Sequence, residues 1–251
     1  CVFCWRDLRY HTEPAMGNGI DEPADIVEGT IEAQRKLLSG FGGNEKTSEE
    51  KFERAMEPQH VAISLDGEPT LYPRLTELIK EYKKKNFSTF VVSNGLLPER
   101  IKKLLEEPPT QLYISVDAPN EELFNLIDRP IIKNAWEGLM KTLSLLPELR
   151  EKTRTVLRFT LIKGMNMEHA EQWAEIIKLS NPMFVEVKAY MWVGMSRERL
   201  EQANMPLHEE VKLFAEEVAK YADYKVIDEH EPSRVVLLMK EDFEGRVMKF
   251  D

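Results

Sequence analysis

Short apolar runs rich in β-branched and aromatic residues recur along the chain, each bounded by polar or turn-forming residues. Runs of roughly four to eight such residues predict buried β-strands. The predicted strands are His60–Leu65, Phe87–Val92, Gln111–Val116, Thr155–Ile162, Met183–Ala189, Tyr224–Asp228 and Arg234–Met239.

Between these runs, apolar residues recur with the spacing of amphipathic helices. The clearest helical faces are Ile26/Val27/Ile31/Leu37/Leu38, Leu75/Leu78/Ile79/Tyr82 and, after a helix-start signal at Pro206–Glu209, Val211/Phe214/Ala215/Val218/Tyr221. Almost continuously apolar strands that alternate with helices predict βα units and a parallel sheet. Because such crossovers are right-handed, and because the strands are too many for a short open sheet, we expect an α/β fold with a whole or partial (β/α) barrel.

Composition excludes several classes of protein. Of 251 residues, 42% are hydrophobic and 31% are charged, which is typical of a globular protein. No apolar run approaches the roughly 20 residues that span a bilayer. The net charge of −10 argues against nonspecific nucleic-acid binding, although a local basic surface could still contact one structured RNA. The polar segment Phe41–Pro58 predicts a loop followed by a helix, so we expect a single domain over residues 1–251.

The two cysteines, Cys1 and Cys4, are too few for a disulfide framework and indicate a reducing, cytoplasmic location. Their Cys-x-x-Cys spacing is compatible with a redox dithiol, with part of a metal site, or with chance. Structural zinc usually has four protein ligands, and an iron–sulfur cluster needs more than two cysteines. A metal at this pair would therefore need a ligand from elsewhere. The chain does not begin with methionine, so we do not expect Cys1 to be the biological N-terminus.

Polar residues follow the predicted strands at the end where barrel enzymes carry their working side chains. Gly67 and Glu68 follow the first strand and could approach and bind an ammonium group, or simply form a β-turn closed by Pro69. Ser93 and Asn94 follow the second strand and suit a ribose or carboxylate, or an Asn-Gly turn.

Ser115 and Asp117 lie at the end of the third strand. Asp117 is a candidate base or hydrogen-bond acceptor. Alternatively, it caps the following helix, a role that Asn120 could also take.

Three charged residues interrupt the fourth and fifth apolar strands. A barrel-facing Arg158 would suit a carboxylate or phosphate, which a guanidinium binds with parallel hydrogen bonds. Lys188 could form an imine or a charge pair. Glu186 lies on the same strand face as Lys188, so an internal Glu186–Lys188 pair is the simpler interpretation.

The order and position of these features resemble the radical S-adenosylmethionine (SAM) superfamily, whose fold is a partial (β/α)₆ barrel. Its cluster motif is Cys-x₃-Cys-x₂-Cys, and Cys1-Val2-Phe3-Cys4 matches the second and third cysteines. The first cysteine is expected four residues before Cys1, together with the first strand. Across the whole chain, segments such as CVFCWRDLRY, HVAISLDGEPTLYP, LYISVDAP and VEVKAYMWVGMS are similar to the 4-demethylwyosine synthase family of wybutosine biosynthesis.

This resemblance implies a radical SAM enzyme that condenses N1-methylguanosine, next to the anticodon of tRNA-Phe, with pyruvate to form a tricyclic base. It implies that Cys1 and Cys4 ligate a [4Fe–4S] cluster and that Gly67 and Glu68 receive the SAM ammonium. Its remaining SAM-binding residues would be Ser93, Asn94, Ser115, Asp117 and Arg158. Glu186 and Lys188 would lie on the substrate side of the pocket.

The family also has a second [4Fe–4S] cluster and a pyruvate-binding lysine, whose residues precede this chain. A flavodoxin-like protein or another one-electron donor is expected to supply the electron. Several basic residues could either meet tRNA phosphates or be ordinary surface charge in a chain with 34 Lys and Arg: Arg6, Arg9, His11, Arg129, Lys163, Arg197 and Arg199. The alternatives are another radical SAM enzyme, such as a glycyl-radical activase, and a noncatalytic metal- or RNA-binding barrel.

Overall fold

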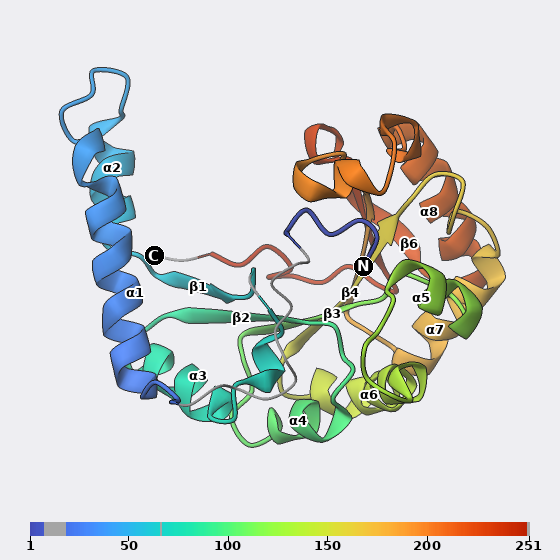
Figure 1. Cartoon of the computed structure of the whole chain (residues 1–251), viewed down its shortest axis with the longest axis horizontal. Coiled ribbons are helices and arrows are strands. Elements are labelled where there is room, and N and C mark those ends of the chain that lie inside the picture. Colours follow the sequence, from blue (N-terminus) through green and yellow to red (C-terminus); the bar gives the residue numbers. More distant parts are fainter. Residues whose placement is uncertain (8–18, 66, 250–251) are drawn as a thin grey trace.

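A single seven-stranded sheet forms the centre of the molecule (Figure 1). The computed structural model describes residues 1–7, 19–65 and 67–249. All seven predicted strands are confirmed, with boundaries shifted by one or two residues. They are β1 (His60–Ile63), β2 (Ser88–Ser93), β3 (Gln111–Ser115), β4 (Arg154–Leu161), β5 (Phe184–Ala189), β6 (Lys225–His230) and β7 (Val235–Met239).

The strand order is β1-β2-β3-β4-β5-β7-β6, and β1 to β5 pair in parallel, as the βα pattern predicts. The predicted parallel pairing holds for β1 to β5 and ends there, because β7 runs antiparallel to both β5 and β6. Only the short 3₁₀ turn Glu231–Ser233 joins β6 to β7. A parallel return needs a crossover of a dozen or more residues. The connection from β6 to β7 is too short for such a crossover, so β7 runs antiparallel to β6.

Helices cover the outer face of the curved sheet, and in the view of Figure 1 α3, α4, α6 and α7 follow one another along it. The helices are α1 (Pro23–Leu38), α2 (Glu49–Met56), α3 (Leu75–Lys84), α4 (Pro98–Lys103), α5 (Glu121–Ile127), α6 (Ala135–Arg150), α7 (Ala170–Ser180) and α8 (His208–Ala222). The three predicted helices are confirmed as α1, α3 and α8, and α2 is the helix expected in segment 41–58. Two residues of the predicted apolar helix faces are not buried, because Leu37 of α1 and Tyr221 of α8 are exposed.

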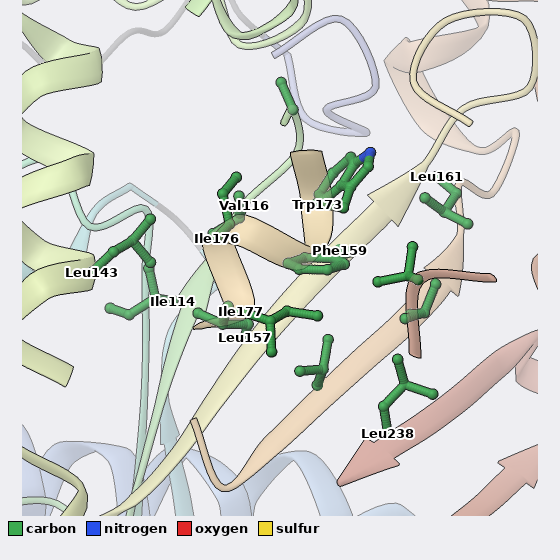
Figure 2. Close-up of a cluster of buried hydrophobic side chains, with 14 of the residues drawn as sticks. Ile114, Val116, Leu143, Leu157, Phe159, Leu161, Trp173, Ile176, Ile177 and Leu238 are labelled. Atoms are coloured by element: carbon green, nitrogen blue, oxygen red, sulfur yellow. The ribbon is translucent and has the colours of Figure 1, made fainter. Parts of the chain in front are cut away.

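The main hydrophobic core lies between the sheet and these helices. Figure 2 shows its centre, where Phe159 of β4 meets Trp173 of α7 with ring centroids 4.4 Å apart. Both side chains are fully buried. Burial of one large apolar side chain contributes roughly 1.5–3 kcal/mol, so this layer holds α7 firmly against the sheet. The same continuous cluster extends from Val2 to Leu238.

Alternation along the strands separates this apolar layer from a polar inner face. In β4, Leu157, Phe159 and Leu161 are buried in the core, whereas Arg158 and Thr160 between them are only partly buried. This follows from the period of two in a pleated strand. The polar inner face is therefore where a site can form.

The C-terminal segment closes the other end of this inner face, where the strands begin. Arg154 at the start of β4 donates hydrogen bonds to the carbonyl oxygens of Gly245 and Arg246, at 3.4 and 2.6 Å. Phe243 packs against Phe184 at the start of β5, with centroids 5.9 Å apart. The end at which the parallel strands finish carries the polar residues identified from the sequence.

Gly95 is required where β2 turns toward α4. Its φ is +71°, and a Cβ there would lie 2.9 Å from Ile114 and 3.1 Å from Leu139. We expect Gly95→Ala to lower the free energy of unfolding by about 2–4 kcal/mol, through backbone strain and overpacking. Urea denaturation measures this. Gly29→Ala is the matched control, because Gly29 lies inside α1 with no atom within 4 Å of its added Cβ, and it should be neutral or slightly stabilising. Equal stability of the two variants would contradict the assignment.

Candidate functional site

Glu68 joins the ends of β1 and β2. Its Oε1 accepts hydrogen bonds from the Thr70 amide at 3.1 Å, the Thr70 hydroxyl at 2.7 Å and the Ser93 hydroxyl at 2.7 Å. Its Oε2 accepts one bond, from the Asn94 amide at 2.9 Å. These contacts fix the carboxylate across two neighbouring strand ends.

The distribution of these bonds leaves Glu68 able to bind a ligand. A carboxylate offers about four acceptor sites, and the single bond that Oε2 accepts from the described residues leaves capacity at that oxygen. An ammonium group would make a charge-assisted hydrogen bond there. The turn interpretation is also correct, because Glu68 caps the 3₁₀ turn Pro69–Leu71 and Gly67 has a φ of +76°. The turn is what presents the carboxylate.

Ser93 and Asn94 support Glu68 in this structure. Ser93 is buried, and besides its bond to Glu68 its hydroxyl accepts the Gly95 amide at 3.0 Å. The Asn94 side-chain oxygen accepts the Leu96 amide at 3.1 Å, as in the predicted Asn-Gly turn. Both residues therefore hold the carboxylate and the turn together.

Asp117 is buried at the end of β3, and its Oδ1 accepts the Thr160 amide of β4 at 3.2 Å. Burial raises the pKa of Asp117 well above the usual value, and the nearby Asp128 carboxyl raises it further. The helix cap is Asn120, whose Oδ1 accepts the Leu123 amide at 3.0 Å. Of the two alternatives for Asp117, the structure thus supports the hydrogen-bond acceptor.

Asn166 is a residue that sequence reasoning missed. Its buried amide donates to the carbonyl oxygens of Asp117 and Thr160, both at 2.8 Å, and its Oδ1 accepts the Ile162 amide at 2.6 Å. It therefore fixes the ends of β3 and β4 relative to each other. The only signal in the sequence was an asparagine shortly after a strand, which by itself predicts a turn.

Arg158, Glu186 and Lys188 gather on the inner face of β4 and β5. Ser115, Arg158 and Glu186 are neighbours in the sheet register. The Arg158 Nε donates to Glu186 Oε2 at 3.2 Å, and its guanidinium lies 4.4 Å from the centroid of the Tyr113 ring. The ion pair of Glu186 is thus with Arg158, in place of the Glu186–Lys188 pair expected from the sequence.

The environment of this group changes two pKa values. Burial lowers the pKa of Lys188, and the Arg158 charge lowers it further, while Glu186 acts in the opposite direction. Burial, together with Glu186, raises the pKa of Tyr113 to about 12. Lys188 accordingly carries a larger neutral fraction than a lysine with an ordinary pKa, which suits it to react as an amine.

Cys1 and Cys4 lie on one turn, where the Cys4 amide donates to the Cys1 carbonyl at 3.2 Å. Both are free thiols, and Cys1 Sγ donates to Asp128 Oδ1 at 3.0 Å. Burial raises the pKa of Asp128 to about 7. Within residues 1–7, 19–65 and 67–249, no group of three or more His, Cys, Asp or Glu side chains could hold a metal. The pair therefore fits a cluster only together with a further ligand.

The predicted tRNA-contacting residues have varied surroundings. Arg9 and His11 lie outside the described residues. Arg6 and Arg197 stack on Trp5 and Trp192, at 4.5 and 4.8 Å from the ring centroids. The remaining three make other bonds: Arg129 to the Leu126 carbonyl, Lys163 to Glu210, and Arg199 to the carbonyls of Val2 and Cys4. Arg199 is thus committed to the cysteine loop.

Comparison with known proteins places this site in a family. Residues 1–177 match the radical SAM superfamily, and residues 179–240 match the wyosine base formation family. The chain is 48% identical over 245 residues to the S-adenosyl-L-methionine-dependent tRNA 4-demethylwyosine synthase of Pyrococcus abyssi, covering 96% of this chain and 71% of that protein. The chain belongs to the tRNA 4-demethylwyosine synthase family of radical SAM enzymes.

Other 4-demethylwyosine synthases agree. The protein of Methanocaldococcus jannaschii is 40% identical, over 96% of this chain and 77% of that protein. The mouse protein is 39% identical over 97% of this chain, which spans 33% of the mouse protein. The family expected from the sequence is therefore confirmed. The match of residues 179–240 to the wyosine base formation family distinguishes the chain from the glycyl-radical activases.

Solved structures confirm the partial barrel. A structure of TYW1 with a lysine–pyruvate adduct bound has a TM-score of 0.83 and 40% identity, and covers 96% of this chain and 75% of that one. An archaeal TYW1 crystal structure has a TM-score of 0.76 and 37% identity over 94% of this chain and 75% of that one. Among the described residues, no helix is both long and apolar enough to span a membrane.

Proposed function

We propose that the chain provides the SAM-cleaving core of an enzyme that condenses N1-methylguanosine of tRNA-Phe with pyruvate to form 4-demethylwyosine. The observation that carries this proposal is the pair of consecutive family matches, radical SAM over residues 1–177 and wyosine base formation over residues 179–240. Glu68 supports it independently, because its carboxylate is held ready for an ammonium at the expected position.

The residues present fit part of a cluster site. Cys1 and Cys4 are thiols on one turn and would supply two of the three ligands of a [4Fe–4S] cluster, the third coming from an upstream cysteine. When bound, the cluster supplies the electron that splits SAM into methionine and a 5′-deoxyadenosyl radical. The protein residues bind and orient the reactants.

Around SAM, we assign the ammonium to Glu68, with Gly67 allowing close approach and Ser93 and Asn94 holding the carboxylate. Arg158 uses Nε for Glu186, which leaves its two Nη groups to bind the SAM carboxylate. Ser115 and Asp117, at the end of β3, face the ribose.

Glu186 and Lys188 are assigned to the substrate side. The Arg158–Glu186 ion pair leaves Lys188 as a partly buried amine without a carboxylate at hydrogen-bond distance within the described part of the chain. A buried charge is costly unless it is paired. An anionic substrate group, such as the carboxylate of pyruvate, would provide that partner, and Glu186 orients the neighbouring Arg158.

We propose that a second [4Fe–4S] cluster and a pyruvate-binding lysine come from residues outside this chain. We also propose that a flavodoxin-like protein or another one-electron donor supplies the electron, and that the enzyme acts in the cytoplasm.

We further propose that residues 1–251 form one domain, supported by the continuous core from Val2 to Leu238. An iron content near eight atoms per protein and a single cooperative unfolding transition would bear out the second cluster and the single domain.

The full-length protein, reconstituted anaerobically with iron and sulfide, tests the function. With SAM, a reductant, pyruvate and N1-methylguanosine-containing tRNA, we expect 5′-deoxyadenosine and a tricyclic guanine product, both measured by mass spectrometry. Absence of 5′-deoxyadenosine would exclude radical chemistry. Its formation without a tricyclic base would indicate a different substrate.

Replacing Glu68 tests its role in SAM binding. Glu68→Ala removes a charge-assisted hydrogen bond worth roughly 1.5–3 kcal/mol, so SAM affinity should fall about 10- to 100-fold in equilibrium binding. Iron content should stay near wild type. Glu77→Ala is the control, since Glu77 pairs with Arg74 on the surface. Unchanged SAM affinity in Glu68→Ala would refute the assignment.

Replacing Lys188 separates substrate binding from SAM cleavage. Lys188→Met keeps the length of the side chain but removes the charge, so we expect the KM for pyruvate to rise at least tenfold while SAM affinity is retained. Steady-state product formation at varied pyruvate concentration measures this. Lys178→Met is the control, because Lys178 pairs with Glu175 on exposed α7 surface. A wild-type KM in Lys188→Met would remove Lys188 from the substrate site.

A further inference from the structure

The turn that carries the two cysteines is held by a segment almost two hundred residues away in sequence. We propose that Arg199 and Gly194 are positioning residues that fix the cysteine loop and thereby control how firmly the protein retains its cluster. This rests on the assignment of Cys1 and Cys4 as cluster ligands, and it adds a role for residues of the wyosine base formation region.

Arg199 binds two backbone carbonyls of the turn itself. Its Nε donates to the Val2 carbonyl at 3.0 Å, and a terminal guanidinium nitrogen donates to the Cys4 carbonyl. One planar, rigid guanidinium thus fixes the separation of a carbonyl in the middle of the turn and the carbonyl at its end. A guanidinium can do this because its donors lie in a fixed fork.

The backbone of the same segment adds a third bond. The Met195 amide donates to the Trp5 carbonyl at 2.9 Å, directly after Cys4. Gly194 makes this approach possible: its φ is +56°, and a Cβ there would lie only 2.3 Å from the Trp5 oxygen. No side chain fits in that space, so position 194 requires glycine for the loop to dock.

The holding segment is itself well fixed. The 3₁₀ turn Gly194–Glu198 contains Ser196, which is fully buried and whose hydroxyl bonds the Tyr190 hydroxyl at 2.9 Å and the Val193 carbonyl at 2.6 Å. The Trp192 indole donates to the Leu200 carbonyl at 2.9 Å. The turn therefore acts as a rigid support, and Figure 1 shows this orange part of the chain beside the dark blue N-terminal loop.

A second support lies on the opposite side of the loop. The Val2 amide donates to the Ile127 carbonyl at the end of α5, at 2.8 Å, and the Val2 side chain is buried in the main core. The cysteine turn is thus held between the end of α5 and the segment from Gly194 to Arg199. Outer-shell contacts of this kind typically change metal affinity 10- to 100-fold when removed.

The charge of Arg199 has a separate consequence. A guanidinium bonded to the Cys4 carbonyl places a fixed positive charge beside the ligand turn. Net charge and hydrogen bonding near an iron–sulfur cluster set its reduction potential, and a nearby cation favours the reduced form. Arg199 should therefore raise the midpoint potential as well as hold the loop.

The test uses the full-length protein after anaerobic reconstitution, with four variants. Arg199→Gln removes the charge and the fork, Arg199→Lys keeps the charge alone, and Gly194→Ala blocks docking while leaving Arg199 in place. Arg150→Gln is the matched control, because Arg150 also donates to a backbone carbonyl, that of Asn181 at 3.1 Å, between the end of α6 and the loop after α7. Circular dichroism of each variant reports whether it folds.

The readouts are iron release to a chelator, the electron paramagnetic resonance spectrum of the reduced cluster, and its midpoint potential. We expect about tenfold faster iron release in Arg199→Gln and Gly194→Ala. The potential should become more negative in Arg199→Gln, and Arg199→Lys should keep the wild-type potential with intermediate retention. Arg150→Gln should match wild type throughout.

Wild-type retention and spectra in both Arg199→Gln and Gly194→Ala would overturn the proposal. If Arg199→Gln fails to fold, the comparison of Gly194→Ala and Arg199→Lys with wild type decides it. A wild-type protein that cleaves SAM but makes no tricyclic base would refute the proposed function and leave this inference standing.

Discussion

Parallel pairing of β1 to β5 is the constraint on which the rest of the structure depends. Because these strands point the same way, they all finish at one rim, and whatever follows them is brought together regardless of its distance in sequence. Glu68, Ser93, Asp117 and Thr160 become neighbours for this reason. The covering helices bury the other face and so fix the curvature that turns the polar side chains inward.

Hydrogen bonds between polar groups at the ends of adjacent strands make the rim rigid. Glu68 joins β1 to β2, and Asn166 joins the ends of β3 and β4. In a buried setting each missing partner costs roughly 1–3 kcal/mol, so such networks tolerate few alternatives and define one geometry. Among the described residues of this rim, Oε2 of Glu68 and the Nη groups of Arg158 keep hydrogen-bonding capacity that a ligand could use.

Much of this arrangement could be predicted from the sequence, because burial leaves a direct trace in apolar periodicity. The helices α6 and α7 were not predicted, but the strands and the helices α1, α3 and α8 were legible in that way. Strand direction was not: the antiparallel β7 follows from its short connection to β6, a signal that the apolar run alone does not contain. Partners also depend on register. Glu186 pairs across the sheet with Arg158 rather than along its own strand with Lys188, and only the alignment of β4 with β5 decides this.

The contact between Arg199 and the cysteine turn also sets an order of events. A chain is synthesised from its N-terminus, so the cysteines emerge first while the residues that hold them emerge nearly two hundred positions later. Closing so long a loop costs entropy that only the folded barrel between them can offset. On the proposed assignment of Cys1 and Cys4 as cluster ligands, iron delivered during synthesis would meet an unconstrained pair of thiols, and lasting assembly of the cluster would follow translation of residues 194–199.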